Sequence, residues 1–155
     1  MKIRLIAVGQ RPPAWVQEGY SDYVRRLPRD LPMELTEIAA PGRRGGNVDQ
    51  ARAAEAERLL AAIGAGDWVV ALDERGKTWS TLALAEKLEN WRMHGRDVTF
   101  LIGGADGLAP RCLERADHVL SLSAMTLPHA LVRVVLAEQI YRAWTITIGH
   151  PYHRA

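Results

Sequence analysis

One strand and the glycines behind it, VTFLIGGADG at residues 98–107, set the pattern for the whole chain. The first five residues are almost continuously apolar, which is typical of a strand that is covered on both faces. Residues 68–72 (WVVAL) and 118–122 (HVLSL) have the same character. Three such runs predict a mainly parallel sheet that is flanked by helices.

The segments around these strands agree with that arrangement. Apolar residues at helical spacing, with Pro, Ser or Gly near the ends, predict helices between the strands. The expected helices span residues 12–27, 47–63, 80–94, 110–116 and 129–144, and two further strands span residues 2–8 and 33–38. No linker or internal repeat interrupts this order, so we expect a single α/β domain over residues 1–155.

Composition sets the class of protein. Of the 155 residues, 48% are hydrophobic and 25% are charged, as in ordinary globular domains. The single cysteine, Cys112, excludes an internal disulfide. No apolar run is long enough to span a membrane, and the charged start lacks a signal-peptide core, so we expect a cytoplasmic protein without membrane contact. The net charge of +2 permits a nucleic-acid partner without requiring one.

The expected site lies where the strands end. In open α/β sheets, ligands bind outside the carboxyl ends of the strands. That rule selects the turn after Leu72, the glycines after Ile102 and the loop after Leu122. The small, hydroxyl-bearing loop at residues 123–128 could hold and cover a flat heterocycle, and glycines let a ligand approach the backbone closely.

A different site is suggested by ALDERGKT at residues 71–78, which fits a relaxed phosphate-loop pattern. A phosphate loop needs inward backbone N–H groups without negative charge nearby, and Asp73 and Glu74 would repel the phosphates. The next helix is expected to start at Ser80 rather than directly after Lys77. We therefore favour a tight turn at Gly76 over a nucleotidase site.

The C-terminal part of the chain offers two further features. In the last helix, a broad buried face is expected for Leu131, Val134, Val135, Gln139 and Ile140, with Arg133, Glu138 and Arg142 outside it. So much apolar surface favours a dimer contact. His150 and His153 lie three residues apart on a proline-containing tail, which is poor spacing for a metal site, so no metal is expected.

Several long motifs, in order and at full length, resemble one known family. They are Leu72-Asp73 with Gly76-Lys77, residues 100–104 with Gly107, residues 120–123 and 125–129, Arg133, residues 138–143 and residues 151–154. The sequence resembles the small bacterial methyltransferases of the knotted SPOUT class, which methylate N3 of a pseudouridine in 23S ribosomal RNA on the assembled ribosome. The resemblance covers essentially the whole chain and implies one SPOUT methyltransferase domain.

The resemblance implies a trefoil knot near the C-terminus, a homodimer and S-adenosylmethionine as cofactor. The implied cofactor-binding residues are Leu72, Gly103, Gly104, Leu122, Ser123, Ala124, Met125, Thr126 and Leu127. They coincide with the three strand-end segments that topology selects independently.

With this activity implied, the residues expected to catalyse methyl transfer lie in the last helix and the tail. N3 of the base must lose a proton, so we expect Arg142 and Arg154 to stabilise negative charge and His129 or His153 to relay the proton. Glu138 would orient one of these groups, and Tyr152 would stack on the base. If the tail reaches the partner's cofactor, each site is composite.

The sequence leaves open which arginines contact RNA and whether the protein is an enzyme. Candidate phosphate contacts are Arg25, Arg26, Arg29, Arg43 and Arg44, although solvated surface arginines would have the same pattern. The alternative to an enzyme is a non-catalytic ribosome-binding factor, and a phosphate-loop nucleotidase is a weaker alternative.

Overall fold

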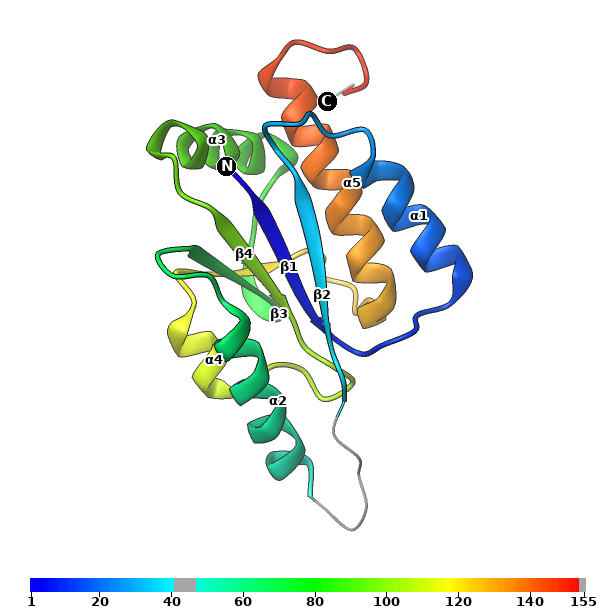
Figure 1. Ribbon diagram of the computed structural model, residues 1–155, viewed down its shortest axis with the longest axis vertical. Coiled ribbons are helices and arrows are strands. Elements are labelled where there is room, and N and C mark those ends of the chain that lie inside the picture. Colours follow the sequence, from blue (N-terminus) through cyan, green and yellow to red (C-terminus); the bar gives the residue numbers. More distant parts are fainter. Residues whose placement is uncertain (41–46, 154–155) are drawn as a thin grey trace.

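A computed structural model describes residues 1–40 and 47–153. In chain order the elements are β1 (Ile3–Val8), α1 (Ala14–Val24), β2 (Met33–Ile38), α2 (Val48–Ala62), β3 (Trp68–Thr78), α3 (Thr81–His94), β4 (Val98–Ile102), α4 (Pro110–Arg115), β5 (His118–Ser121) and α5 (His129–Thr147) (Figure 1). Every expected strand and helix is present; β2 and β4 have the expected bounds, and the bounds of the other elements are shifted.

The five strands form one sheet in the order β2-β1-β4-β3-β5. Each neighbouring pair runs parallel, which confirms the predicted α/β class. Because all strands point the same way, the loops that follow them meet at one edge of the sheet. We call this the carboxyl edge, and the opposite side the amino edge.

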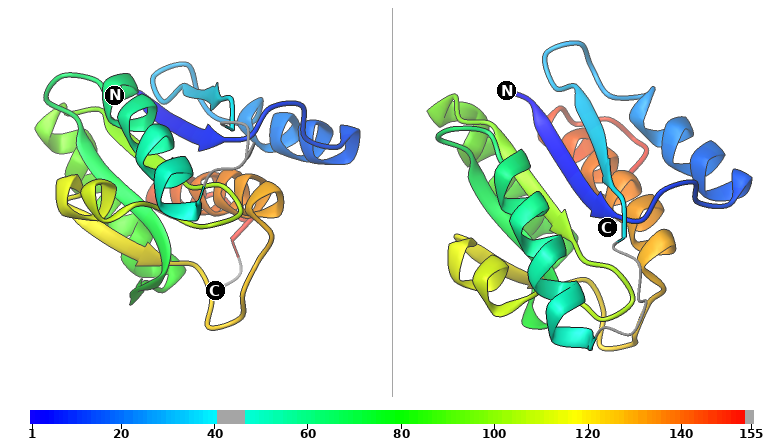
Figure 2. Two further views of the ribbon diagram at one scale, coloured as in Figure 1. Left: turned by 90° about the horizontal axis from the view of Figure 1, so that it is seen from below. Right: turned by 60° about the horizontal axis from the view of Figure 1, so that its bottom comes forward.

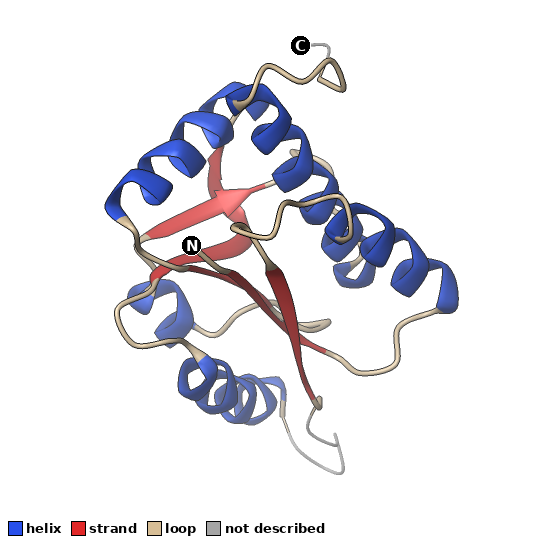
Figure 3. Ribbon diagram, turned by 45° about the horizontal axis from the view of Figure 1, so that its top comes forward, coloured by secondary structure: helices blue, strands red, loops and turns tan. Residues whose placement is uncertain are grey.

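Helices cover both faces of the sheet (Figures 2 and 3). One face carries α1, α3 and α5, and the other carries α2 and α4. Alternate residues of β1 enter two separate cores: Leu5 joins the core under α3 and α5, while Ile6 joins the core under α2 and α4. Burial on both sides explains why the sheet's central strands read as continuous apolar runs.

Local end signals are confirmed for α3. The Ser80 hydroxyl accepts a hydrogen bond from the Ala83 N–H at 3.0 Å, which satisfies one free donor at the start of the helix. Gly95 ends the helix with a φ of 66°, a conformation that favours glycine. Elsewhere the bounds differ: α1 spans 14–24 rather than 12–27, and β5 ends at Ser121.

The turn expected at Gly76 is wrong, because β3 continues to Thr78. After Leu72 pairs with Leu120, the strand bulges and pairs again, with Lys77 opposite Leu120. A Cβ on Gly76 would lie 2.6 Å from the Val119 carbonyl carbon, so only glycine lets the extended strand lie this close to β5. Lys77 and Thr78 therefore belong to a strand, and a phosphate loop is not formed here.

The buried face expected for α5 is also wrong in part. The helix runs to Thr147, three residues beyond the expected end, and Leu131, Val134, Val135 and Gln139 are only half-buried. Arg133, expected outside the buried face, is 2% exposed. Leu136 and Ala137, which were not expected there, are fully buried beside Ile140.

Arg133 is buried because two strand ends supply its partners. Its Nη1 donates to Glu37 Oε2 at 2.8 Å, and its Nη2 donates to the Gly9 carbonyl at 2.7 Å. Glu37 lies at the end of β2, and Gly9 directly follows β1. The side chain therefore joins the start of α5 to the carboxyl edge of the sheet.

We expect Arg133→Ala to lower the free energy of unfolding by about 3 kcal/mol, because removal of one partner leaves buried polar groups unpaired. Urea unfolding measures this change. The matched control is Arg92→Ala, which removes a surface ion pair with Asp30 at 2.7 Å and should cost less than about 1 kcal/mol. Equal losses in the two variants would contradict the structural role of Arg133.

Candidate functional site

The three strand-end segments selected from the sequence line one cavity. The cavity has a volume of about 780 Å³ and opens at the carboxyl edge of β3, β4 and β5. Its lining comprises Arg52, residues 72–75, 102–107, 120–123 and 125–129, and Val132. The expected convergence of the three segments is thereby confirmed, and only Ala124 of the nine expected cofactor residues lies outside the lining.

The turn after β4 forms one wall, and it depends on a close backbone contact. A Cβ on Gly103 would lie 2.6 Å from the Gly107 carbonyl carbon. Gly104 and Gly107 pair in an isolated antiparallel bridge, and Gly107 has a φ of 76°. The chain thus folds back on itself at once, and its glycines let another group approach the backbone closely.

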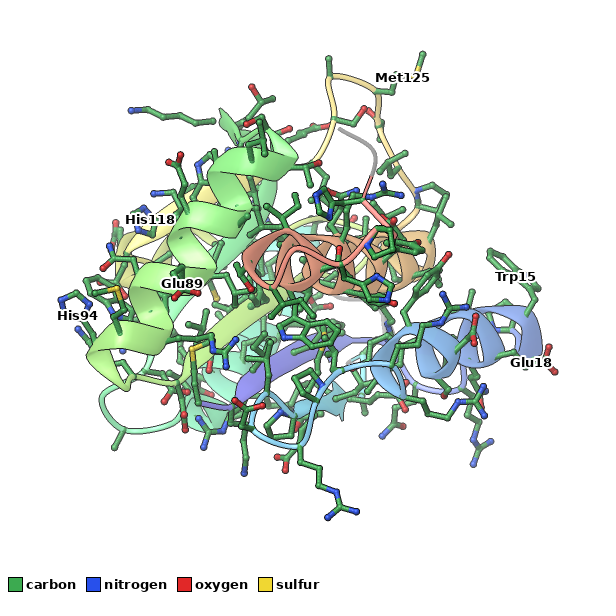
Figure 4. All side chains as sticks on the ribbon, turned by 90° about the horizontal axis from the view of Figure 1, so that it is seen from above. Trp15, Glu18, Glu89, His94, His118 and Met125 are labelled. Atoms are coloured by element: carbon green, nitrogen blue, oxygen red, sulfur yellow. The ribbon has the colours of Figure 1, made fainter. Side chains whose placement is uncertain are left out.

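The loop after β5 forms the opposite wall, and local hydrogen bonds shape it. Ser121 Oγ donates to the Ser123 carbonyl at 3.0 Å, and Ser123 Oγ accepts from the Met125 N–H at 2.9 Å. Thr126 Oγ1 donates to Glu74 Oε2 at 3.3 Å, which links this loop to β3. Met125, at the tip, is 77% exposed and projects from the rest of the molecule (Figure 4).

Charged side chains line the cavity, and most of them were not predicted as site residues. Arg75 Nε donates to Asp73 Oδ1 at 2.9 Å, and its Nη2 donates to Oδ2 at 3.0 Å. These hydrogen bonds hold the pKa of Asp73 below its ordinary value, so this carboxylate stays ionised. Arg52 reaches the cavity from α2, and only the three-dimensional packing of α2 reveals it.

His129 is the one predicted proton-relay residue that lines the cavity. It begins α5, and its Nε2 would lie 3.6 Å from a Cβ on Gly9. Arg133, one turn further along, fixes this end of the helix through Glu37 and Gly9. His129 is therefore held beside the ends of both β1 and β5.

A second polar cluster lies toward the other end of α5. Arg142 donates to Glu138 Oε1 through Nε at 2.8 Å, and the Tyr152 hydroxyl donates to the same oxygen at 3.1 Å. The Tyr152 ring lies 5.0 Å from the Arg142 guanidinium and 4.6 Å from the Tyr141 ring. Burial, and to a smaller extent the negative charge of Glu138, raises the pKa of Tyr152 to about 12.

The two groups of predicted catalytic residues are apart within one chain. Arg142 follows His129 by 13 residues on α5, which corresponds to about 20 Å along the helix axis. In Figure 1 the tail lies at the top, beyond the end of α5 that is remote from the carboxyl edge. His153 is half-buried on this tail, and Arg154 lies outside the described residues.

The candidate phosphate contacts differ in their surroundings. Arg26 pairs with Asp22 at 2.9 Å and lies over the rings of Tyr23 and Tyr141. Arg25 lies 3.7 Å from the same carboxylate, and Arg29 is exposed. Two other candidates, Arg43 and Arg44, fall outside the described residues.

Residues 1–40 and 47–153 contain neither a candidate metal centre nor a candidate membrane-spanning helix. In this part of the chain, no three His, Cys, Asp or Glu side chains gather in a way that could hold a metal ion. The same residues contain no helix that is long and apolar enough to cross a membrane.

Comparisons with known proteins agree with the fold. The family model described as predicted SPOUT methyltransferase matches residues 1–153. A protein of Hahella chejuensis (strain KCTC 2396), named ribosomal RNA large subunit methyltransferase H, is 55% identical over 156 residues, with 99% of each chain covered.

Solved structures show the same fold at low identity. A "probable methylase family protein" from Haemophilus influenzae Rd KW20 aligns with a TM-score of 0.61 at 12% identity, over 99% of this chain and 70% of that one. TrmJ from Z. mobilis ZM4 aligns with a TM-score of 0.52 at 17% identity, over 92% and 70%. With a family model that spans nearly every residue and a relative more than half identical, the chain belongs to the SPOUT methyltransferase family.

Proposed function

We propose that this protein transfers a methyl group from S-adenosylmethionine to N3 of a pseudouridine in large-subunit ribosomal RNA. The observation that carries the proposal is the meeting of three strand-end segments around one cavity, in a chain that is 55% identical to a protein named for ribosomal RNA methylation. The assembled ribosome in the cytoplasm is the proposed setting.

The cavity suits the proposed cofactor in size and chemistry. Its volume of about 780 Å³ falls in the range of roughly 300–1,000 Å³ that is usual for small-ligand sites. Glycine backbone at 103–107 offers N–H and C=O groups, while Leu72, Leu122 and Leu127 offer apolar cover. We propose that these residues, with Gly103, Gly104 and the loop at 123–126, hold the cofactor.

When bound, S-adenosylmethionine supplies an electrophilic methyl group. The acceptor nitrogen is a weak nucleophile until its proton leaves, so the protein must favour the anion. His129 is placed to accept or relay that proton at the cavity. Arg142 and Arg154 would stabilise the charge, and Tyr152 would stack on the base.

We propose a homodimer with composite sites, because Arg142 and Tyr152 would reach a cavity only on a second subunit. Within one chain, about 20 Å of helix separates Arg142 from His129, and a helix without a kink cannot fold the two together. A partner chain could present its Glu138, Arg142 and Tyr152 cluster to the cavity. The C-terminal trefoil knot expected for the family belongs to the same proposal.

The function is tested by incubating labelled S-adenosylmethionine with large ribosomal subunits and with naked 23S RNA. We expect methyl transfer to N3 of one pseudouridine in the particles, and much less with naked RNA, because a chain of net charge +2 has little basic surface for RNA alone. Calorimetry should show cofactor binding without metal. Ribosome binding without methyl transfer would instead favour a non-catalytic factor, and stabilisation by nucleotides alone would favour a nucleotidase.

We expect Gly103→Val to weaken cofactor binding by at least about tenfold, because a Cβ would collide with the backbone at Gly107 and displace the turn. Calorimetry gives the affinity, and a thermal melt checks that the variant folds. The control is Gly66→Asn, at a turn on the amino edge where a Cβ meets nothing within 4 Å and Asn tolerates the φ of 78°. Unchanged affinity in a folded Gly103→Val would reject this cavity.

The composite site is tested by mixing subunits. Gly103→Val removes the cavity of its own chain, and Arg142→Ala removes the charged group that the chain would present to its partner. Co-expressed at equal levels, the two inactive variants should recover about a quarter of wild-type activity, because half of the dimers hold one intact site of two. If each site lay within one chain, the mixture would stay inactive.

A further inference from the structure

The short segment from the end of β1 through the first turn of α1 carries one exposed aromatic ring and one unpaired cation. Trp15, in the first turn of α1, is 59% exposed, and its ring contacts no other aromatic or cationic group of the described residues. Arg11 is exposed and forms no ion pair with any residue that the structure describes. The proposed function uses neither side chain.

The position of this segment follows from the sheet. Gly9 extends the pairing of β1 with β2, since its N–H donates to the Ile38 carbonyl at 2.8 Å. His129, which lines the cavity, lies against Gly9. Gly9 therefore lies at the carboxyl edge beside a residue of the cavity, and residues 10–15 lead from it into the first turn of α1. In Figure 4, Trp15 projects from α1 at the right of the view, and Met125 marks the site loop at the top.

The segment is held in an unusual conformation. Arg11 has a φ of 54°, the only positive φ of a residue other than glycine in the described part of the chain. That conformation costs about 1 kcal/mol or more, and such strain persists where the surroundings impose it, often at functional sites. Pro12 and Pro13 stiffen the turn, and Gln17 Nε2 donates to the Pro12 carbonyl at 2.9 Å. Arg11 and Trp15 are thus presented on a rigid support.

The geometry points to a docking site for a single RNA strand, and we propose that Trp15 stacks on an unpaired base while Arg11 contacts a flanking phosphate. This inference rests on the proposed ribosomal RNA substrate. A base needs only one exposed ring to stack on, and a phosphate needs a free cation. Glu18, exposed near Trp15 (Figure 4), would repel phosphate, so the strand's backbone belongs on the Arg11 side of the ring.

A partner protein is a less suitable ligand than RNA for the surface around Trp15. The neighbours of Trp15 on α1, Ala14, Gln17 and Glu18, are exposed and small or polar. A protein interface needs a contiguous apolar centre, which one tryptophan does not supply. The other large exposed apolar side chains of the described helices are Val48 of α2 and Leu82 and Met93 of α3.

The test compares Trp15→Ala, Trp15→Phe and Arg11→Gln with wild type in co-sedimentation with large ribosomal subunits at several salt concentrations. Loss of one stacked base should weaken binding about 5- to 150-fold, and phenylalanine should restore most of it. Arg11→Gln should weaken binding and lower the slope of log K against log salt by about 1. Calorimetry should show unchanged affinity for S-adenosylmethionine in all three variants.

Matched controls lie at the amino edge. Met93, at the end of α3, is 78% exposed, and Arg115, at the end of α4, is exposed with a single long ion pair to Asp117 at 4.0 Å, so Met93→Ala and Arg115→Gln remove an apolar and a cationic group away from the cavity. Both should bind ribosomes within twofold of wild type. Equal binding by Trp15→Ala, equal weakening by the controls, or loss of the dimer in Trp15→Ala would each overturn the proposal.

Binding is measured separately from methylation, so the two proposals fail separately. A wild type that binds large subunits but transfers no methyl group rejects the proposed function, while the Trp15 comparison still decides the docking site. A wild type that methylates, with a Trp15→Ala variant that binds equally well, rejects the docking site alone.

Discussion

Two backbone contacts at the carboxyl edge hold the site together, and each requires a residue without a side chain. At Gly103 a Cβ would lie 2.6 Å from the backbone of Gly107, and at Gly76 a Cβ would lie 2.6 Å from the backbone of Val119. The opposing atoms belong to strands or to a closed turn and cannot move aside cheaply. These contacts bring the turn after β4 and the extended β3 close enough to β5 to enclose one cavity.

The last helix connects that cavity with a second polar cluster. At its start, buried Arg133 binds the Gly9 carbonyl and Glu37, so the helix cannot shift relative to β1 and β2. Toward its other end, Glu138 gathers Arg142 and Tyr152. On a straight helix Arg142 lies about 20 Å from His129, which lines the cavity, so an acceptor that needed both would have to meet two chains. In the proposed composite site, the rigidity of this helix would link catalytic geometry to oligomeric state.

Features with local causes were predictable from the sequence, and features with distant causes were not. The caps at Ser80 and Gly95 and the apolar strands depend on neighbouring residues, and they were placed correctly. The continuation of β3 beyond Leu72 depends on pairing with β5, more than forty residues later, and the prediction of a turn failed there. Arg133 looked like a surface residue because its partners lie about a hundred residues away. Arg52 reaches the cavity only through the packing of α2, for which the sequence has no local signal.

Polar pairs stabilise both edges of the sheet, but the carboxyl edge also carries an unpaired cation. At the amino edge, polar groups satisfy one another: Asp67 accepts hydrogen bonds from Arg4 and Thr99, each at 2.6 Å. The Lys2 N–H likewise donates to Asp97 at 2.8 Å. At the carboxyl edge, by contrast, Arg11 is exposed and forms no ion pair with any residue that the structure describes. A group already paired must lose that pairing to bind a ligand, whereas an unpaired group loses nothing. Parallel strands gather the free groups at a single edge, and RNA contacts are therefore to be sought beside the cavity rather than among arginines that are already paired, such as Arg26 with Asp22.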